Sequence, residues 1–154
     1  MSLKSTLFAA LAGLTLAAPA MAQEIHVLDT YARSASPMAK TGAAFMLIEN
    51  IGDAPDRLIA VKSTAAKKVE LHTHREEGGV MKMVHVEEGF ELGAGETLFL
   101  QRGGHHVMFM GLTEPFEQGK TIPLTLIFEK SGEITLDIPV DLERTPQAGH
   151  GHGN

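Results

Sequence analysis

Short runs rich in Val, Ile, Thr and Phe recur along the chain, separated by turn-forming Gly, Pro, Asn and Asp. Apolar and polar residues alternate within several runs, which is typical of a strand with one buried face. We expect nine strands, at residues 25–31, 43–49, 57–63, 68–74, 80–86, 97–100, 106–112, 122–129 and 133–140. The one helical candidate, Ala65–Lys68, is too short to form a helix alone. Short strands at regular spacing predict an all-β sandwich or Greek-key barrel.

The two ends of the chain depart from this pattern. Residues 1–22 combine Lys4, an apolar stretch and the small residues Ala20 and Ala22 around Met21, as a cleaved secretory signal peptide does. The apolar stretch is shorter than the roughly 20 residues of a spanning helix. We therefore expect an exported chain without membrane insertion. The strands predict one β domain over residues 23–143, and residues 144–154 have the composition of a flexible, His-containing tail.

The composition of the chain excludes several kinds of partner and of functional site. The chain has 154 residues with 13 Lys+Arg against 19 Asp+Glu, and this acidic balance disfavours nucleic acid as a partner. It contains no cysteine, which excludes disulfides, thiolate metal sites, blue-copper sites and cysteine nucleophiles. Eight histidines and eight methionines remain as the unusual feature.

Alternation within three predicted strands places these His and Met side chains on single faces. The sets are His72 with His74, Met81 with Met83 and His85, and His106 with Met108 and Met110. A thioether binds Cu(I) well and Zn²⁺, Mg²⁺ or Ca²⁺ poorly, while imidazole binds both copper states. Two His with two Met therefore favour Cu(I). The alternative is a non-metal β-sandwich binding module, in which the methionines fill the core and the histidines are incidental.

The segments at 68–74, 79–83 and 102–112 resemble the periplasmic PCu(A)C-type copper chaperones. That family has a His, ten residues, a Met, about twenty-one residues and then His-x-Met. Here ten residues separate His72 from Met83, and twenty-two separate Met83 from His106. His105 has the family's interval but lacks a Met two residues later, so we assign His106 and Met108 and keep His105 in place of His106 as the alternative. The extra residue is placed in the turn at 86–89, where an insertion costs little.

The resemblance implies a cupredoxin-like β-barrel that binds Cu(I) through His72, Met83, His106 and Met108. It also implies a periplasmic copper chaperone whose acceptor is the Cu(A) centre of cytochrome c oxidase, in subunit II. Copper storage or resistance is an alternative task for the same site. Some relatives carry a His- or Met-rich C-terminal extension that binds Cu(II), and His150 and His152 are the candidates for such an auxiliary site here.

An enzymatic alternative is a cupin-type oxygenase using His72, His74 and a nearby Glu. In that motif three or four residues separate the second His from the Glu, whereas Glu76 and Glu77 follow His74 after one or two. The chain also lacks a serine nucleophile elbow and a phosphate-binding glycine loop. We therefore predict a metal carrier and no enzyme, with the roles of His74, His85, Met81 and Met110 left open.

Overall fold

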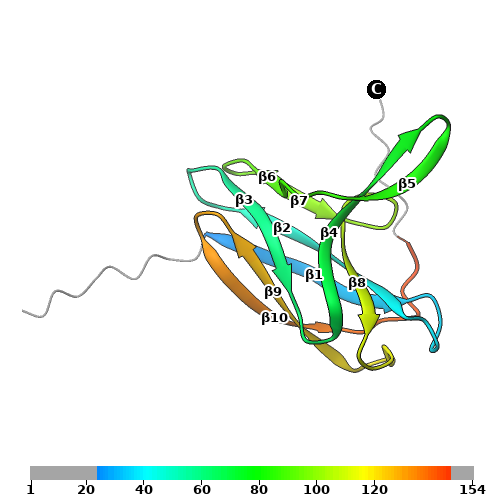
Figure 1. The fold of residues 1–154 in the computed structure, drawn as a ribbon. Helices are drawn as coiled ribbons and strands as arrows, with labels where there is room; N and C mark the ends of the chain where they lie inside the picture. The colour runs from blue at the N-terminus through cyan, green and yellow to red at the C-terminus, as the bar shows by residue number, and fades with distance from the viewer. Residues whose placement is uncertain (1–23, 147–154) are drawn as a thin grey trace, which may run out of the picture.

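The strands seen in the structure follow the alternating pattern closely. The computed structural model describes residues 24–146, which form ten strands and no helix (Figure 1). These are β1 (Ile25–Ser34), β2 (Thr41–Asn50), β3 (Asp56–Lys62), β4 (Ala66–Glu77), β5 (Val80–His85), β6 (Phe90–Leu92), β7 (Thr97–Leu100), β8 (His106–Leu112), β9 (Thr121–Phe128) and β10 (Gly132–Pro139). All nine expected strands are present. The three-residue strand β6 was missed.

Two antiparallel sheets face each other across the core (Figure 1). The first has the order β1-β2-β8-β4-β5, with β7 also paired to β2, and the second has the order β10-β9-β3-β6. Each strand buries alternate residues; β9, for example, buries Ile122, Leu124, Leu126 and Phe128 and turns the residues between them outward. The fully buried side chains come from both sheets, as in any sandwich. The largest are Phe109, Met46, Ile48, Leu58, Leu92, Leu100, Leu124, Leu126 and Ile138.

Strand β4 extends beyond the sheet to form a projecting hairpin with β5 (Figure 1). Strand β8 pairs with β4 only as far as His72, whereas β5 pairs with β4 from His72 to Glu77. The turn is Gly78-Gly79, and both glycines have a positive φ (61° and 79°), which a tight two-residue hairpin turn requires. Because the hairpin has no third strand, its apolar side chains Val80, Met81 and Met83 are more than half exposed.

A break between β7 and β8 shapes the region where the histidines gather. Strand β7 pairs with residues 46–49 of β2, and β8 then pairs with residues 41–44 of the same strand. The connecting turn at 101–105 is closed by a hydrogen bond from the Gln101 N–H to the His105 carbonyl, and Gly103 has a φ of 83°. This turn holds the Gly104 carbonyl beside β4.

Three expectations fall outside the described residues: the signal peptide at 1–22, most of the tail at 144–154, and the tail histidines His150 and His152. Within residues 24–146, no helix is long and apolar enough to cross a membrane.

Candidate metal site

The outward face of the first sheet carries the His and Met side chains in matched rows. Across neighbouring strands, His106 pairs with His72 and His72 pairs with His85. Met83 pairs with His74, and residues paired in this way point to the same face of a sheet. The opposite face carries core residues such as Leu71 and Val107. The three donor sets, each expected to share a face of its own strand, therefore share one face of the whole sheet.

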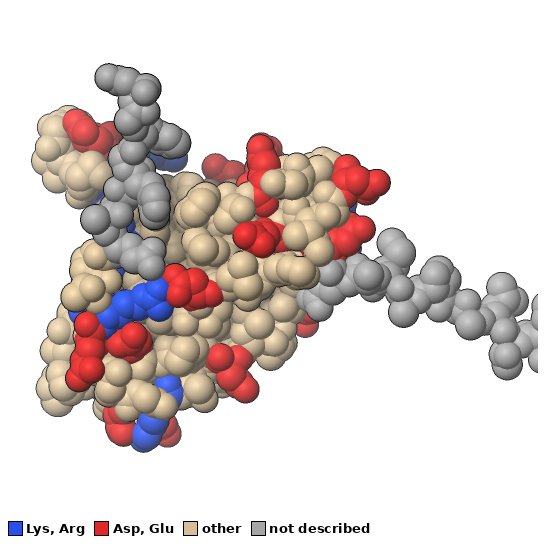
Figure 2. All heavy atoms as spheres, turned by 180° about the vertical axis from the view of Figure 1, so that it is seen from behind, with Lys and Arg blue, Asp and Glu red and all other residues tan. Residues whose placement is uncertain are grey.

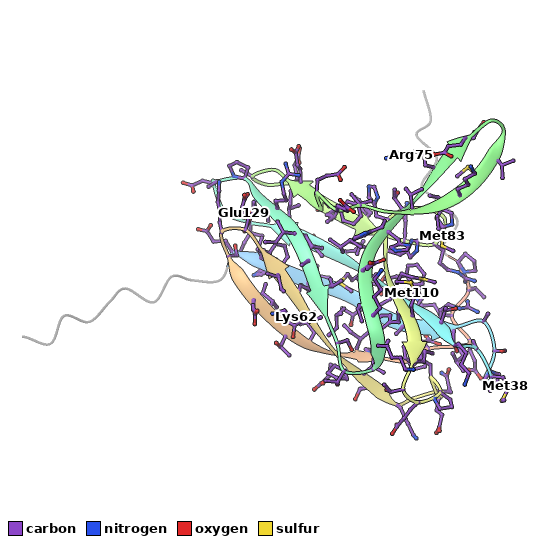
Figure 3. The ribbon with its side chains drawn as sticks, in the orientation of Figure 1. Met38, Lys62, Arg75, Met83, Met110 and Glu129 are labelled. Atoms are coloured by element: carbon purple, nitrogen blue, oxygen red, sulfur yellow. The ribbon has the colours of Figure 1, made fainter. Side chains whose placement is uncertain are left out.

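An open cavity of about 330 Å³ lies on this face where the hairpin leaves the sheet. Its lining includes His74, Met83, His106 and Met108. Three of these, Met83, His106 and Met108, are residues that the sequence assigned to the metal. Met110 lies further along β8 and does not line the cavity (Figure 3).

His72, the fourth expected ligand, lies beside the cavity, and His74 lines it instead. The His72 ring centroid is 5.9 Å from that of His106, and the His74 centroid is 5.4 Å from it. The three imidazoles therefore form one cluster around His106. Sequence reasoning found His74 on the correct face but gave it no role.

Hydrogen bonds fix which nitrogen of His72 has a free lone pair. Its Nε2 lies 3.0 Å from the Glu70 carboxylate, which at neutral pH can only accept, so Nε2 carries the proton. The Nδ1 atom is then an acceptor, and it is buried without a hydrogen-bond partner in the described structure. An unpartnered buried nitrogen is unfavourable unless a ligand uses its lone pair. A carboxylate behind a histidine is also a common support for a metal-binding imidazole.

The Gly104 carbonyl fixes the other two imidazoles. It accepts hydrogen bonds from Nδ1 of His106 at 3.0 Å and from Nδ1 of His74 at 3.3 Å. Both rings are therefore protonated on Nδ1 and keep the Nε2 lone pair available. Nothing in the sequence indicated that the Gly104 carbonyl would orient two histidines.

Burial keeps His106 neutral. His106 is 3% exposed. Burial lowers its pKa, against the hydrogen bond to Gly104 and with a further contribution from neighbouring His74, His72 and His105. A neutral imidazole is the form that binds a metal ion, so burial prepares this side chain for ligation.

His105 points away from the cavity. Its Nδ1 lies 2.9 Å from the Thr73 hydroxyl, and its ring packs against Phe90 with centroids 4.2 Å apart. Burial lowers its pKa. Its position gives no support to the spacing alternative in which His105 replaces His106.

His85 and Glu70 complete the face next to His72. The His85 ring lies 5.8 Å from the His72 ring, and its Nδ1 is 3.7 Å from the Glu70 carboxylate. Glu70 also pairs with Lys68. Burial opposes its ionisation, but the contacts with His72, Lys68 and His85 outweigh this and lower its pKa. Within residues 24–146, no three His, Asp or Glu side chains are arranged to hold a metal ion. Other possible donor atoms that line the cavity are the sulfurs of Met83 and Met108.

Comparisons with known proteins agree with this architecture. The model of the LpqE-like family, described as "Putative lipoprotein LpqE-like", matches residues 25–140. Putative lipoprotein Lxx21020 of Leifsonia xyli subsp. xyli is 36% identical over 98 residues, which are 64% of this chain and 59% of that protein. The chain thus matches about three fifths of this relative's length.

Solved structures give the same fold. The copper-bound PCuAC domain from PmoF2 is 27% identical, has a TM-score of 0.64, and is matched over 77% of this chain and 93% of that one. The solution structure of CuI-DR1885 from Deinococcus radiodurans is 32% identical, has a TM-score of 0.61, and is matched over 80% and 84%. The expected all-β, cupredoxin-like fold is confirmed by the two antiparallel sheets and by these neighbours. Since the family model covers most of its length, the chain belongs to the LpqE-like family.

Proposed function

We propose that this protein binds Cu(I) on the outward face of its first sheet and carries it to an acceptor protein. The observation that carries the proposal is the meeting of two thioethers, Met83 and Met108, with the His106 imidazole in one open cavity. This donor set is soft and neutral, which suits Cu(I) better than Zn²⁺ or Mg²⁺. The similarity to a copper-bound PCuAC domain and to CuI-DR1885 supports the same cargo.

The proposed ligands are His72, Met83, His106 and Met108. His72 offers Nδ1 and His106 offers Nε2, since their other ring nitrogens are hydrogen-bonded to Glu70 and Gly104. His74 keeps its Nε2 available on the cavity wall, so it is a further donor along the path by which the ion enters or leaves.

Exposure of the site favours transfer over retention. Met83 is 52% exposed and sits at the base of the projecting hairpin (Figure 3). A partner's ligands can therefore approach the ion and replace the donors one at a time. We propose the periplasm as the compartment and the Cu(A) centre of cytochrome c oxidase, in subunit II, as the acceptor. The chain's lipoprotein-like relatives support export.

We also propose that His150 and His152 form an auxiliary Cu(II) site. Imidazole is a good ligand for Cu(II), and the two histidines are spaced by one glycine. Deleting residues 147–154 should remove one bound Cu(II) and leave Cu(I) affinity unchanged. Unchanged Cu(II) stoichiometry after the deletion would contradict the auxiliary site.

An anaerobic titration tests the main proposal. The mature protein and its variants compete for Cu(I) against a coloured chelator. His72→Ala and His106→Ala are expected to weaken binding strongly, while His26→Ala, on an exposed position of β1, is the matched control. The proposal also expects one tight Cu(I) per chain and little Zn²⁺ binding at this site. Wild-type affinity in both site variants would refute the assigned ligands.

A further inference from the structure

The cavity on the His and Met face extends well beyond the donor atoms. Its volume of about 330 Å³ far exceeds that of one metal ion, since a water molecule occupies about 30 Å³ of liquid. The wall away from the hairpin is formed by Arg33, Ala43 and Arg102. Among the described residues that line the cavity, none is acidic.

Strand register explains why the hollow forms there. Arg33 of β1 pairs with Ala43 of β2, and Ala43 pairs with Met108 of β8. The three residues therefore form one row across the sheet, with a small side chain between two long ones. Adjacent strands lie about 4.8 Å apart, so roughly 10 Å of backbone spacing separates Arg33 from Met108. Because the Ala43 side chain is small, a bound group has room to contact both Arg33 and Met108.

Both arginines of this wall are available to bind an anion. Neither forms an ion pair with any residue of the described chain, whereas Arg57 pairs with Glu91 and Arg144 pairs with Asp29. Arg102 uses one N–H to reach the Arg144 carbonyl, and its other donors are not engaged with described residues. Two unpaired guanidinium groups thus border one cavity.

The positive charge is local, because the chain as a whole is acidic. It has 19 Asp+Glu against 13 Lys+Arg, and Figure 2 shows Asp and Glu spread over one face of the molecule. Tyr31 lies close to the arginines: burial and, to a smaller extent, the charge of Asp29 raise its pKa, and the charges of Arg102, Arg144 and Arg33 act in the opposite direction. The Arg144 guanidinium also lies 4.3 Å above the Tyr31 ring. Arginines therefore cluster at this end of the sheet.

We propose that Arg33 and Arg102 bind a carboxylate inside this cavity, next to the metal donors. A guanidinium group forms paired hydrogen bonds with a carboxylate, and partial burial in a cavity strengthens them. The carboxylate can belong to an acidic side chain of a partner protein or to a small polycarboxylate that chelates metal ions. In either case it would lie beside Met108, where a carboxylate oxygen can approach the bound ion. This proposal does not depend on copper being the cargo, because neither arginine is among the proposed metal donors.

Two probes distinguish the sources: citrate, and a ten-residue peptide containing four Asp or Glu residues. Each is titrated into the metal-free mature protein and followed by amide chemical shifts. Arg33→Gln and Arg102→Gln should each weaken binding about ten-fold. Arg75→Gln is the matched control, because Arg75 is an exposed arginine without a described ion pair on the nearby hairpin and does not line the cavity (Figure 3).

Each outcome decides the proposal. Binding of citrate alone assigns the site to a small chelator, binding of the peptide alone assigns it to a partner side chain, and both results support the arginine site. Equal weakening by Arg75→Gln would overturn it, since that indicates only general charge attraction. Absence of shifts around the cavity with both probes would also overturn it. Met108→Leu keeps the bulk of the wall and removes one proposed thioether ligand, so it should bind both probes like the wild type while its Cu(I) affinity falls.

Discussion

Glu70 offers a graded test of how the proposed site is supported. Its carboxylate is not a proposed ligand, but it accepts the hydrogen bond from His72 Nε2 at 3.0 Å and so leaves Nδ1 as the donor atom. Glu70→Gln keeps an oxygen that can accept this bond and removes the negative charge. Glu70→Leu removes both the acceptor and the charge. The two variants therefore separate orientation of the ring from its electrostatic support.

The expected magnitudes follow from the role of such supporting groups. Removing a partner of a metal-binding histidine typically lowers metal affinity by about 10- to 100-fold. We expect Glu70→Gln to lower Cu(I) affinity about 10-fold, equivalent to about 1.4 kcal/mol, and Glu70→Leu about 100-fold. Anaerobic competition against a chelator measures both values. Glu76→Gln is the matched control, because Glu76 is exposed on the same face of β4 and pairs with Met81 rather than a histidine.

Two results would refute this reasoning. If Glu70→Leu binds Cu(I) as tightly as the wild type, His72 is not held as a ligand by Glu70. If Glu76→Gln weakens binding as much as Glu70→Gln, the effect comes from net charge alone. Circular dichroism of each variant checks that the fold is kept.

Two further predictions concern the scaffold. Asp56 is buried and accepts hydrogen bonds from the Ser131 hydroxyl and from three backbone N–H groups, so Asp56→Ala should cost about 2–3 kcal/mol in urea unfolding. Burial opposes ionisation of Asp56, but these hydrogen bonds outweigh it and lower the pKa of the carboxyl group. The ionised side chain therefore stabilises the fold fully above the unfolded pKa of about 3.9, and this stabilisation is lost as pH falls through the folded pKa. Asp56→Asn should reduce the loss of unfolding free energy at acid pH. Gly42→Ala would place a Cβ 2.5 Å from the Phe116 ring and should lower the free energy of unfolding by about 1–3 kcal/mol. The control is Gly104→Ala, whose Cβ would have its nearest contact at 3.6 Å, and its free energy of unfolding should be within about 0.5 kcal/mol of the wild type. Unchanged unfolding midpoints for Asp56→Ala and Gly42→Ala would contradict these assignments.

Alternation in the sequence predicted most of the scaffold because one face of each strand must be buried. It also placed His72 with His74, and His106 with Met108, on common faces. Residues two apart in a strand point to the same face whichever strands lie beside it. Strand β6 was missed because Phe90–Leu92 is too short to show a period. The extension of β4 to Glu77 was missed because those residues pair only with β5.

The arrangement of the site depends on strand order and register, and neither can be predicted from the alternation of apolar and polar residues. His74 lines the cavity because it pairs with Met83 on the projecting hairpin. Arg33 reaches the same cavity because β1, β2 and β8 are consecutive in the sheet. Nothing in the local sequence around Arg33 indicated this position, which joins residues far apart in the chain.

X-ray absorption spectroscopy of the Cu(I)-loaded mature protein tests the central claim most directly, because it counts sulfur and nitrogen neighbours of the metal. We predict two thioether sulfurs and two imidazole nitrogens in the wild type, and one sulfur in each of Met83→Leu and Met108→Leu. Met81→Leu, on the exposed part of the hairpin outside the cavity, should leave the spectrum unchanged. A wild-type spectrum with only nitrogen and oxygen neighbours, or a sulfur count unaffected by Met108→Leu, would contradict the proposed site.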